Sequence, residues 1–311
     1  MTPRQLTALL TAASVWGASF LFIRVLMDAG MDPVGMSAAR TSLGTLALLP
    51  FAWLARSRFP RSPRTWLALA VLAFVNFALP WTLFGYGEKH VESGMASIAN
   101  SGMPLFVAVF ATILIRTERL EAKKVVGLLV GFSGVVALMG GGLRDLGSDS
   151  TRGILVIVVA TACYGISAVS IRRWLRHVHP VPLTIGQVAF ATAFLLPVAL
   201  FTGAYGEASM GWQEWGSLLL LGGLGSGLAV VLYMWLLGEV GPVRASVVTY
   251  LMPPIGVFLG WLLLDESIGW NMAAGLLLII GGVALVQGLP VQKPAPVPAE
   301  ASAAVSAGGG Q

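Results

Sequence analysis

Ten apolar runs, separated by short polar or Pro/Gly-rich breaks, restrict what this chain can fold into. They lie at roughly 6–27, 34–55, 66–86, 94–115, 125–143, 153–171, 182–204, 215–237, 243–264 and 270–289. A helix needs about 20 apolar residues to cross the hydrocarbon core of a bilayer. Only 11% of the residues are charged, whereas about a quarter are charged in soluble domains. The sequence therefore predicts an all-α membrane protein with ten transmembrane helices and no extramembrane domain.

The basic residues indicate how these helices are oriented. If loops alternate between the two faces of the membrane, most lysines and arginines fall on the face that holds the N-terminus. The opposite face carries only Lys89, Arg144 and Arg152. Lysine and arginine collect on the cytoplasmic side of membrane proteins. We therefore expect both termini to be cytoplasmic and the chain to lie in a bacterial inner (plasma) membrane.

The two halves of the chain resemble each other at a nearly constant offset. Trp16–Ser19 resembles Tyr164–Ser167, and Met103–Pro104 resembles Met252–Pro253, at offsets of 148 and 149 residues by subtraction. A repeat with an odd number of spans inserts its second copy upside down, a design that transporters use. We predict two inverted five-helix repeats around a central cavity, at residues 1–147 and 148–289. The Pro/Ala/Gly-rich residues 290–311 are predicted to be a disordered cytoplasmic tail.

The five-plus-five arrangement, the Trp-Gly-x-Ser-Phe motif at 16–20 and the paired Met-Pro steps resemble the drug/metabolite transporter superfamily, EamA-type family. The resemblance covers roughly Leu6 to Leu289. Within this family the sequence looks most like YddG-type exporters of aromatic and other amino acids. The resemblance implies a basket-like bundle with a central cavity, and export of amino acids or similar small metabolites from the cytoplasm.

Polar and aromatic side chains inside the apolar runs are the candidates for substrate contact, because polar groups are costly at bilayer depth. Trp16 and Tyr164, which are mates in the repeat, each have a stacking face and a polar edge. Helix packing is the alternative for both, and it is the stronger reading for the paired Ser19 and Ser167. The predicted substrate-binding residues are Trp16, Ser19, Asn76, Trp81, Tyr86, Asn100, Tyr164, Ser167, Tyr233, Thr249 and Tyr250.

Prolines accompany polar residues in the fourth and ninth runs, as Pro104 and as Pro253 with Pro254. Proline frees a backbone carbonyl, which is tolerable at bilayer depth only if it faces protein or water. We predict that both spans line the cavity and bend at these prolines during transport. The alternative is that the kinks only shape the bundle. Three Gly-x-x-x-Gly spacings, beginning at residues 127, 223 and 256, suit close helix contact.

Charged residues inside the runs are few. Arg40 can attract a substrate carboxylate, or it can reach the outer surface or pair with Asp28 or Asp32, which is the reading we favour. No aspartate or glutamate lies in the middle third of any run, and Glu88 falls at the break that ends the third run. We therefore expect that transport is not coupled through a membrane-embedded acid.

Several functional classes lack their sequence signatures. The chain has no Walker motif, no His-Glu-x-x-His and no Gly-x-Ser-x-Gly, so we expect no ATP-driven step and no hydrolase activity. We expect no metal, no cofactor and no nucleic-acid partner. The expected partners are a small-molecule substrate and the lipid bilayer, and the oligomeric state, a monomer included, stays open.

The leading hypothesis is an inner-membrane transporter that exports amino acids, with aromatic or apolar ones favoured, and related small metabolites by alternating access. A carrier of other metabolites or drugs is a second reading. A membrane enzyme or a non-transporting scaffold is the alternative from another class.

Overall fold

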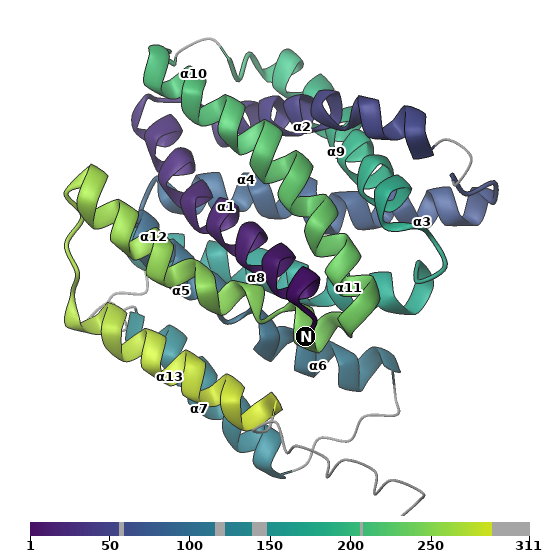
Figure 1. The fold of residues 1–311 in the computed structure, drawn as a ribbon. Coiled ribbons are helices and arrows are strands. Elements are labelled where there is room, and N and C mark those ends of the chain that lie inside the picture. The colour runs from purple at the N-terminus through teal and green to yellow at the C-terminus, as the bar shows by residue number, and fades with distance from the viewer. Residues whose placement is uncertain (56–58, 116–121, 139–147, 206–207, 288–311) are drawn as a thin grey trace, which may run out of the picture.

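The computed structural model describes residues 1–55, 59–115, 122–138, 148–205 and 208–287. These residues form helices and no strand (Figure 1). The α-helices are α1 (Pro3–Asp28), α2 (Pro33–Ala55), α3 (Pro63–Ala73), α4 (Leu79–Glu88), α5 (Ser93–Asn100), α6 (Met103–Ile115), α7 (Ala122–Leu138), α8 (Asp149–Trp174), α9 (Pro180–Thr202), α10 (Trp212–Leu219), α11 (Ala229–Ala245), α12 (Val248–Leu264) and α13 (Trp270–Gln287).

The helices confirm an all-α membrane protein. Among the described residues, six helical segments are long and apolar enough to cross a membrane: Pro3–Asp28, Pro63–Glu88, Ser93–Leu114, Asp149–Trp174, Pro180–Thr202 and Trp212–Pro242. Two shorter apolar helices are Val248–Leu264 and Trp270–Leu285. The other two predicted spans form α2 and α7. The predicted tail at 290–311 lies outside the described residues.

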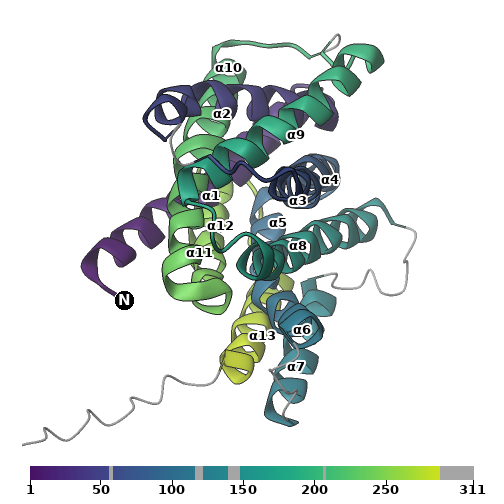
Figure 2. The ribbon, with the colours of Figure 1, turned by 90° about the vertical axis from the view of Figure 1, so that its right-hand side faces the viewer.

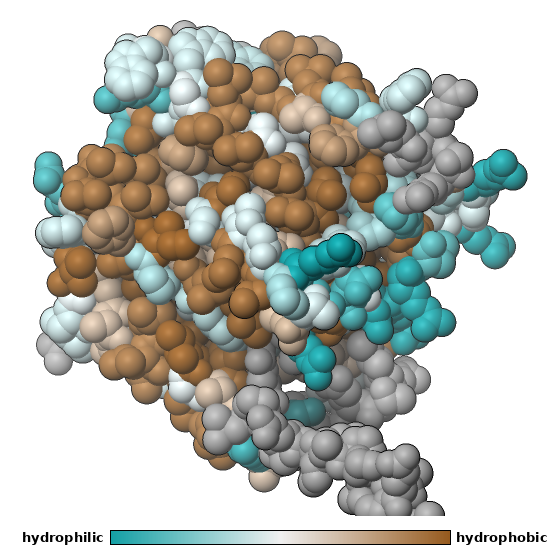
Figure 3. Space-filling view, in the orientation of Figure 1, coloured by the Kyte–Doolittle hydropathy of each residue, from teal (hydrophilic) through white to brown (hydrophobic). Residues whose placement is uncertain are grey.

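Apolar side chains cover much of the face shown in Figure 3, and hydrophilic ones gather toward the end that holds the N-terminus. Hydrogen bonds identify the opposite end, which we call the outer end after the orientation expected from the sequence. There Ser209 donates its backbone N–H to Ala29, and Ser93 contacts Glu266. The turns that follow α1, α4, α9 and α12 therefore meet at one end of the bundle.

Two of the long segments contain π-helical stretches. Phe74–Ala78 joins α3 to α4, and Leu220–Leu228 joins α10 to α11. A π-helix widens the backbone turn, and such stretches occur often at functional sites. In the second stretch the hydroxyl of Ser226 donates to the carbonyl of Leu221, five residues earlier, at 3.1 Å.

One of the predicted proline kinks differs in the structure, that at Pro104. The fourth span is divided at Ser101–Gly102, and Pro104 is the second residue of α6. A proline in the first helical turn removes no intrahelical hydrogen bond, so the break precedes Pro104. Pro253 and Pro254 do lie inside α12, where they leave the carbonyls of Thr249 and Tyr250 without their usual donors.

Glycine lets α7 and α13 approach closely, and both ribbon views show these helices side by side (Figures 1 and 2). A Cβ on Gly134 would lie 2.8 Å from the carbonyl oxygen of Gly275, and a Cβ on Gly282 would meet the backbone of Gly127 and Gly131. The helices are therefore antiparallel. The predicted close approach at residues 256–260 is also present, but a Cβ on Gly223 would meet nothing within 4 Å.

Equivalent contacts occur in both halves of the chain. Gly17 of α1 packs against Met252 and Ile255 of α12, while Gly165 of α8 packs against the Phe106–Val107 step of α6. The hydroxyls of Thr45 in α2 and Thr192 in α9 lie 3.0 Å apart. Thr45 and Thr192 are 147 residues apart, so residues in matching positions of the two halves touch each other.

The α7–α13 contact gives a stability prediction. Gly282→Ala places a methyl group against the facing backbone, and overpacking of this kind costs about 1–3 kcal/mol. We expect a lower Tm for Gly282→Ala in detergent. Gly281→Ala is the matched control, because a Cβ there would meet nothing within 4 Å. Equal Tm values for the two variants would contradict the close approach.

Candidate functional site

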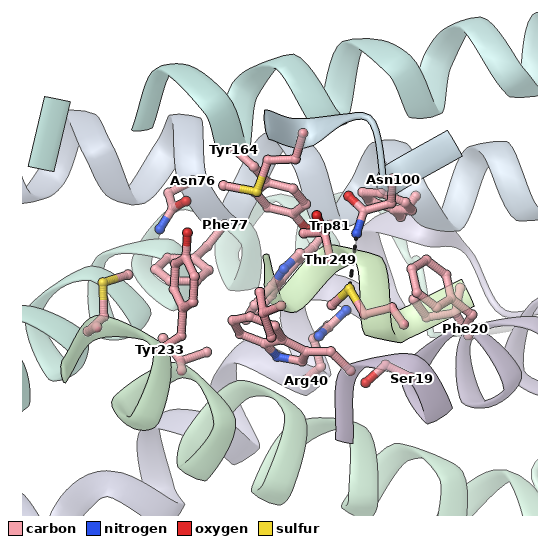
Figure 4. A pocket seen from close by; sticks show the side chains of 18 residues that line it. Ser19, Phe20, Arg40, Asn76, Phe77, Trp81, Asn100, Tyr164, Tyr233 and Thr249 are labelled. Atoms are coloured by element: carbon pink, nitrogen blue, oxygen red, sulfur yellow. Dashed lines mark hydrogen bonds between the residues drawn. The ribbon is translucent and has the colours of Figure 1, made fainter. Parts of the chain in front are cut away.

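A central cavity lies among α1, α2, α4, α5, α6, α8, α11, α12 and the π-helical stretch Phe74–Ala78 (Figure 4). Its lining is largely aromatic and aliphatic, with a small number of polar groups, which is the usual character of a small-molecule site. It includes eight of the eleven predicted binding residues: Trp16, Ser19, Asn76, Trp81, Asn100, Tyr164, Tyr233 and Thr249. Their contact with substrate stays a prediction.

Aromatic rings form much of the wall. Phe84 stacks on Tyr164 with centroids 5.8 Å apart and meets Phe20 edge-on at 5.8 Å. Trp16 and Tyr233 form a second pair at 5.2 Å. Phe20 and Phe84 were missed in the sequence because phenylalanine is unremarkable in an apolar run.

Arg40 is the buried cation of this site, and the favoured sequence interpretation of it was wrong. Its side chain is 3% exposed, lies 3.8 Å above the ring of Trp81 and donates from Nε to the hydroxyl of Ser226 at 3.1 Å. Asp28 instead pairs with Arg24, at 2.9 Å. Within the described chain, no carboxylate pairs with Arg40 and no group accepts a hydrogen bond from its Nη atoms. A planar guanidinium in this state is suited to bind a carboxylate.

The two π-helical stretches each bond to a polar side chain from a neighbouring helix. Arg40 of α2 reaches Ser226 in the second stretch, and Gln187 of α9 accepts a hydrogen bond from Nδ2 of Asn76 in the first, at 3.1 Å. Arg40 and Gln187 occupy matching positions, since they are 147 residues apart by subtraction. The same construction therefore carries a charge in only one half.

Several polar groups in the lining are already satisfied by the protein. The indole N–H of Trp16 donates to the carbonyl of Gly225 at 2.9 Å, which leaves the ring face, and not the polar edge, for a ligand. The hydroxyls of Ser19 and Thr249 donate to carbonyls of their own chain segments, Val15 and Ser246.

Other polar groups of the cavity lack a partner in the described structure. The amide of Asn100 donates to the sulfur of Met252 at 3.5 Å, and its Oδ1 atom accepts nothing. The hydroxyl of Tyr233 is also buried without a partner. An unpaired buried acceptor carries a desolvation penalty, which a ligand donor would relieve.

Three predicted binding residues lie outside the cavity lining. Tyr86 is half exposed and its ring lies 5.4 Å from that of His90. It follows Trp81 by five residues, which places it well round the helix from the wall. Ser167 and Tyr250 are absent from the lining, although both hydroxyls are buried without a partner.

Two carboxylates link the chain segments at the outer end. Glu266, just after α12, accepts hydrogen bonds from the backbone N–H of Ser93 at 2.7 Å, the hydroxyl of Ser93 at 2.9 Å and the N–H of Gly94 at 3.0 Å. A carboxylate at a helix N-terminus is favoured by the unpaired N–H groups and the helix dipole. Glu92 accepts reciprocally from the N–H and hydroxyl of Ser267. We call this set the outer closure.

Glu88 is the functional candidate that the sequence concealed. It is the last residue of α4 and is 0% exposed, and both of its carboxyl oxygens are buried without a hydrogen-bond partner in the described structure. In the sequence it stands beside Lys89 and His90 and looks like part of a loop. Its spacing of seven residues from Trp81, about two helical turns, is the signal that could have placed it on the cavity face.

Comparison with known proteins identifies the chain's relatives. Residues 4–140 and 151–287 each match the EamA-like transporter family. The chain is 23% identical to an uncharacterised transporter, YoaV, of Bacillus subtilis, over 90% of this chain and 95% of that protein. It is 26% identical to a probable terminal-alkyne amino-acid exporter of Streptantibioticus cattleyicolor, over 90% and 92%.

A further relative is the inner membrane transporter YedA of Escherichia coli, which is 26% identical over 90% of this chain and 89% of that protein. A solved crystal structure superimposes with a TM-score of 0.62 at 21% identity, covering 89% of this chain and 98% of that chain. This likeness supports the fold.

The outer closure gives a second stability prediction. Glu266→Ala removes three hydrogen bonds to the start of α5, and hydrogen bonds to charged groups contribute about 1.5–3 kcal/mol. We expect a lower Tm in detergent for Glu266→Ala. Glu239→Ala is the control, because Glu239 of α11 is exposed and is not part of the outer closure. A Tm as high as that of the control would show that the closure contributes nothing.

Proposed function

The chain belongs to the EamA-like transporter family, and from this premise we propose that it exports amino acids across the inner membrane by alternating access. Aromatic or apolar amino acids are the favoured substrates, together with related small metabolites. The observation that carries the proposal is Arg40: a buried guanidinium in an aromatic cavity, with no acid partner in the described chain. Membership of a transporter family also favours a carrier over an enzyme.

The groups around the cavity match the three parts of such a substrate. The free Nη atoms of Arg40 would receive the carboxylate, since arginine binds carboxylates bidentately. The unpaired Oδ1 of Asn100 would accept a hydrogen bond from the ammonium group. The rings of Phe84 and Tyr164 would stack against an aromatic or apolar side chain. A lone cation in the lining disfavours an organic cation, which needs a counter-charge.

A carboxylate-bearing aromatic metabolite without an amine is the second candidate substrate. Arg40 could bind the carboxylate of such a metabolite without help from another residue. The unpaired oxygen of Asn100 would accept a hydrogen bond from an amine, and so it favours the amino acid. A relative named as a probable amino-acid exporter supports the first candidate.

We propose that the architecture is a ten-helix bundle of two inverted repeats, residues 1–147 and 148–289. The double family match supports two related halves. The equivalent packing of Gly17 and Gly165, and the contact between Thr45 and Thr192, support a twofold relation between them. The antiparallel α7–α13 pair supports inversion.

We propose that both termini lie in the cytoplasm, on the strength of the lysine and arginine distribution. The likeness to an inner membrane transporter supports the location. In this orientation the outer closure faces away from the cytoplasm, and breaking it would release substrate outward. The division at Ser101–Gly102 and the proline pair inside α12 are the proposed points of bending.

Flux in proteoliposomes tests the substrate class. We expect labelled phenylalanine to exchange across the membrane and a labelled organic cation not to do so. Arg40→Gln should lower the affinity for phenylalanine by about tenfold or more, because a hydrogen-bonded charge contributes about 1.5–3 kcal/mol. Arg40→Lys, which keeps the charge, should lose less. Exchange of the cation but not of phenylalanine would refute the amino-acid proposal.

A pair of tyrosines tests the cavity wall. Tyr164→Ala removes a ring from the lining and should shift preference from phenylalanine toward smaller or differently shaped amino acids. Stacked aromatic pairs are worth about 0.5–1.5 kcal/mol, so we expect a change of a few-fold in the ratio of apparent affinities. Tyr86→Ala is the matched control outside the lining. Identical ratios in the two variants would remove Tyr164 from the site.

A further inference from the structure

Glu88 is the buried ionisable group that the proposed transport cycle leaves unused. It has no exposed surface, and neither carboxyl oxygen has a hydrogen-bond partner in the described structure. An isolated carboxylate without partners is among the most costly groups to bury, and in practice such a group is neutralised. The environment of Glu88 therefore fits a carboxylic acid that carries its proton.

Neither of the two positive groups near Glu88 bonds to its carboxyl group. Arg24 of α1 donates from Nε to Asp28 at 2.9 Å, and from Nη1 to the backbone carbonyls of Glu88 and Val91 at 3.0 and 3.1 Å. Arg40 of α2 bonds to Ser226. Each cation is close enough to act on Glu88 electrostatically, but neither bonds to its carboxyl group.

Two acids also face Glu88. Asp28 of α1 and Glu266, which follows α12, act on it electrostatically and oppose a second negative charge. Glu266 is the central group of the outer closure, where it accepts the hydrogen bonds of Ser93 and Gly94. Ionisation of Glu88 with the closure intact would thus place two carboxylates in one enclosed region, at a cost in Coulomb repulsion.

The position of Glu88 links the cavity to the outer end. Trp81, Phe84 and Glu88 follow one another at helical spacing along one face of α4, and the first two line the cavity. Glu88 lies one turn beyond Phe84 toward the outer end. Movement that breaks the outer closure would bring water toward this turn.

We propose that Glu88 is a proton-binding site that controls the outer end, holding a proton while the outer closure is shut and losing it when that end opens. This rests on the alternating access proposed above. In the step itself, the O–H bond of the Glu88 carboxyl breaks, water takes the proton, and the carboxylate remains beside Arg24 and Arg40. Rising pH on the outer side therefore favours the open outer end. This proposal departs from the sequence-based expectation that transport is not coupled through a membrane-embedded acid.

Infrared difference spectroscopy of the full-length protein tests the proton directly. The wild type should show the carbonyl-stretch band of a protonated carboxylic acid at neutral pH, and Glu88→Gln should lack that band. Glu239→Gln, which removes an exposed carboxyl group from α11, should keep the band. If Glu88→Gln does not fold, Glu88→Asp should shift the band. A wild type without the band would overturn the proposal.

Thiol accessibility tests the link to the outer end. In a Cys163→Ser background, a cysteine at the cavity position Ile23 is labelled with a membrane-impermeant maleimide from outside. A cysteine at the exposed position Asp149 is labelled in the same way. Its rate corrects for the increase in thiolate reactivity with pH. The corrected rate should rise at least about fivefold from about pH 6 to about pH 9 in the Ile23→Cys protein. It should be flat in the variant that also carries Glu88→Gln.

The two proposals fail separately. A pH-independent corrected rate in the wild type, or an unchanged pH response after Glu88→Gln, would overturn the role of Glu88. Absence of phenylalanine exchange together with a pH-dependent outer end would overturn the amino-acid substrate and leave the proton site supported.

Discussion

The structure depends on one constraint: a polar group surrounded by hydrocarbon must find its partner within the protein. Helices meet this constraint for the backbone, and glycine lets helices pack closely where side chains would separate them. Departures from it occur around the central cavity and at the turn beyond it, and also outside the lining at residues such as Ser167 and Tyr250. The unpaired oxygens of Asn100 and Glu88 and the unpaired hydroxyl of Tyr233 lie at the cavity or at that turn. A ligand in the cavity, or a proton at Glu88, would supply these three groups with the partners that the described structure does not give them.

The two halves place a polar side chain in matching positions, but the side chain is charged in only one of them. The π-helical stretches at Phe74–Ala78 and Leu220–Leu228 each bond to a polar side chain from α9 or α2. One of these side chains is the neutral Gln187 and the other is the charged Arg40. Two near-equivalent halves favour two conformations of similar energy, while a single cation gives the shared cavity a fixed polarity for an anionic group.

In the proposed cycle, the charge of the cavity and the state of the outer end are connected through α4. Arg40 stacks on Trp81, and Glu88 extends the same face of α4 toward the outer closure. Glu266 acts on Glu88 and holds the start of α5. A proton at Glu88 and a substrate carboxylate at Arg40, as proposed, would therefore act within one electrostatic network. Burial makes this network strong, because screening by water is weak there.

The sequence by itself determined the membrane class, the helical runs and the family, because run length and apolar composition decide whether a segment can enter a bilayer. It also indicated eight residues that line the cavity, because polar and amphipathic side chains are rare in the middle of a membrane span. Only the tertiary structure decided which face each residue presents. It turned Tyr86 away from the cavity, brought Arg40 onto Trp81 instead of Asp28, and enclosed Glu88 at a helix end. Burial and hydrogen bonding depend on neighbours far away along the chain, such as Arg40 and Ser226, which are 186 residues apart. Hydropathy along the chain does not record such neighbours.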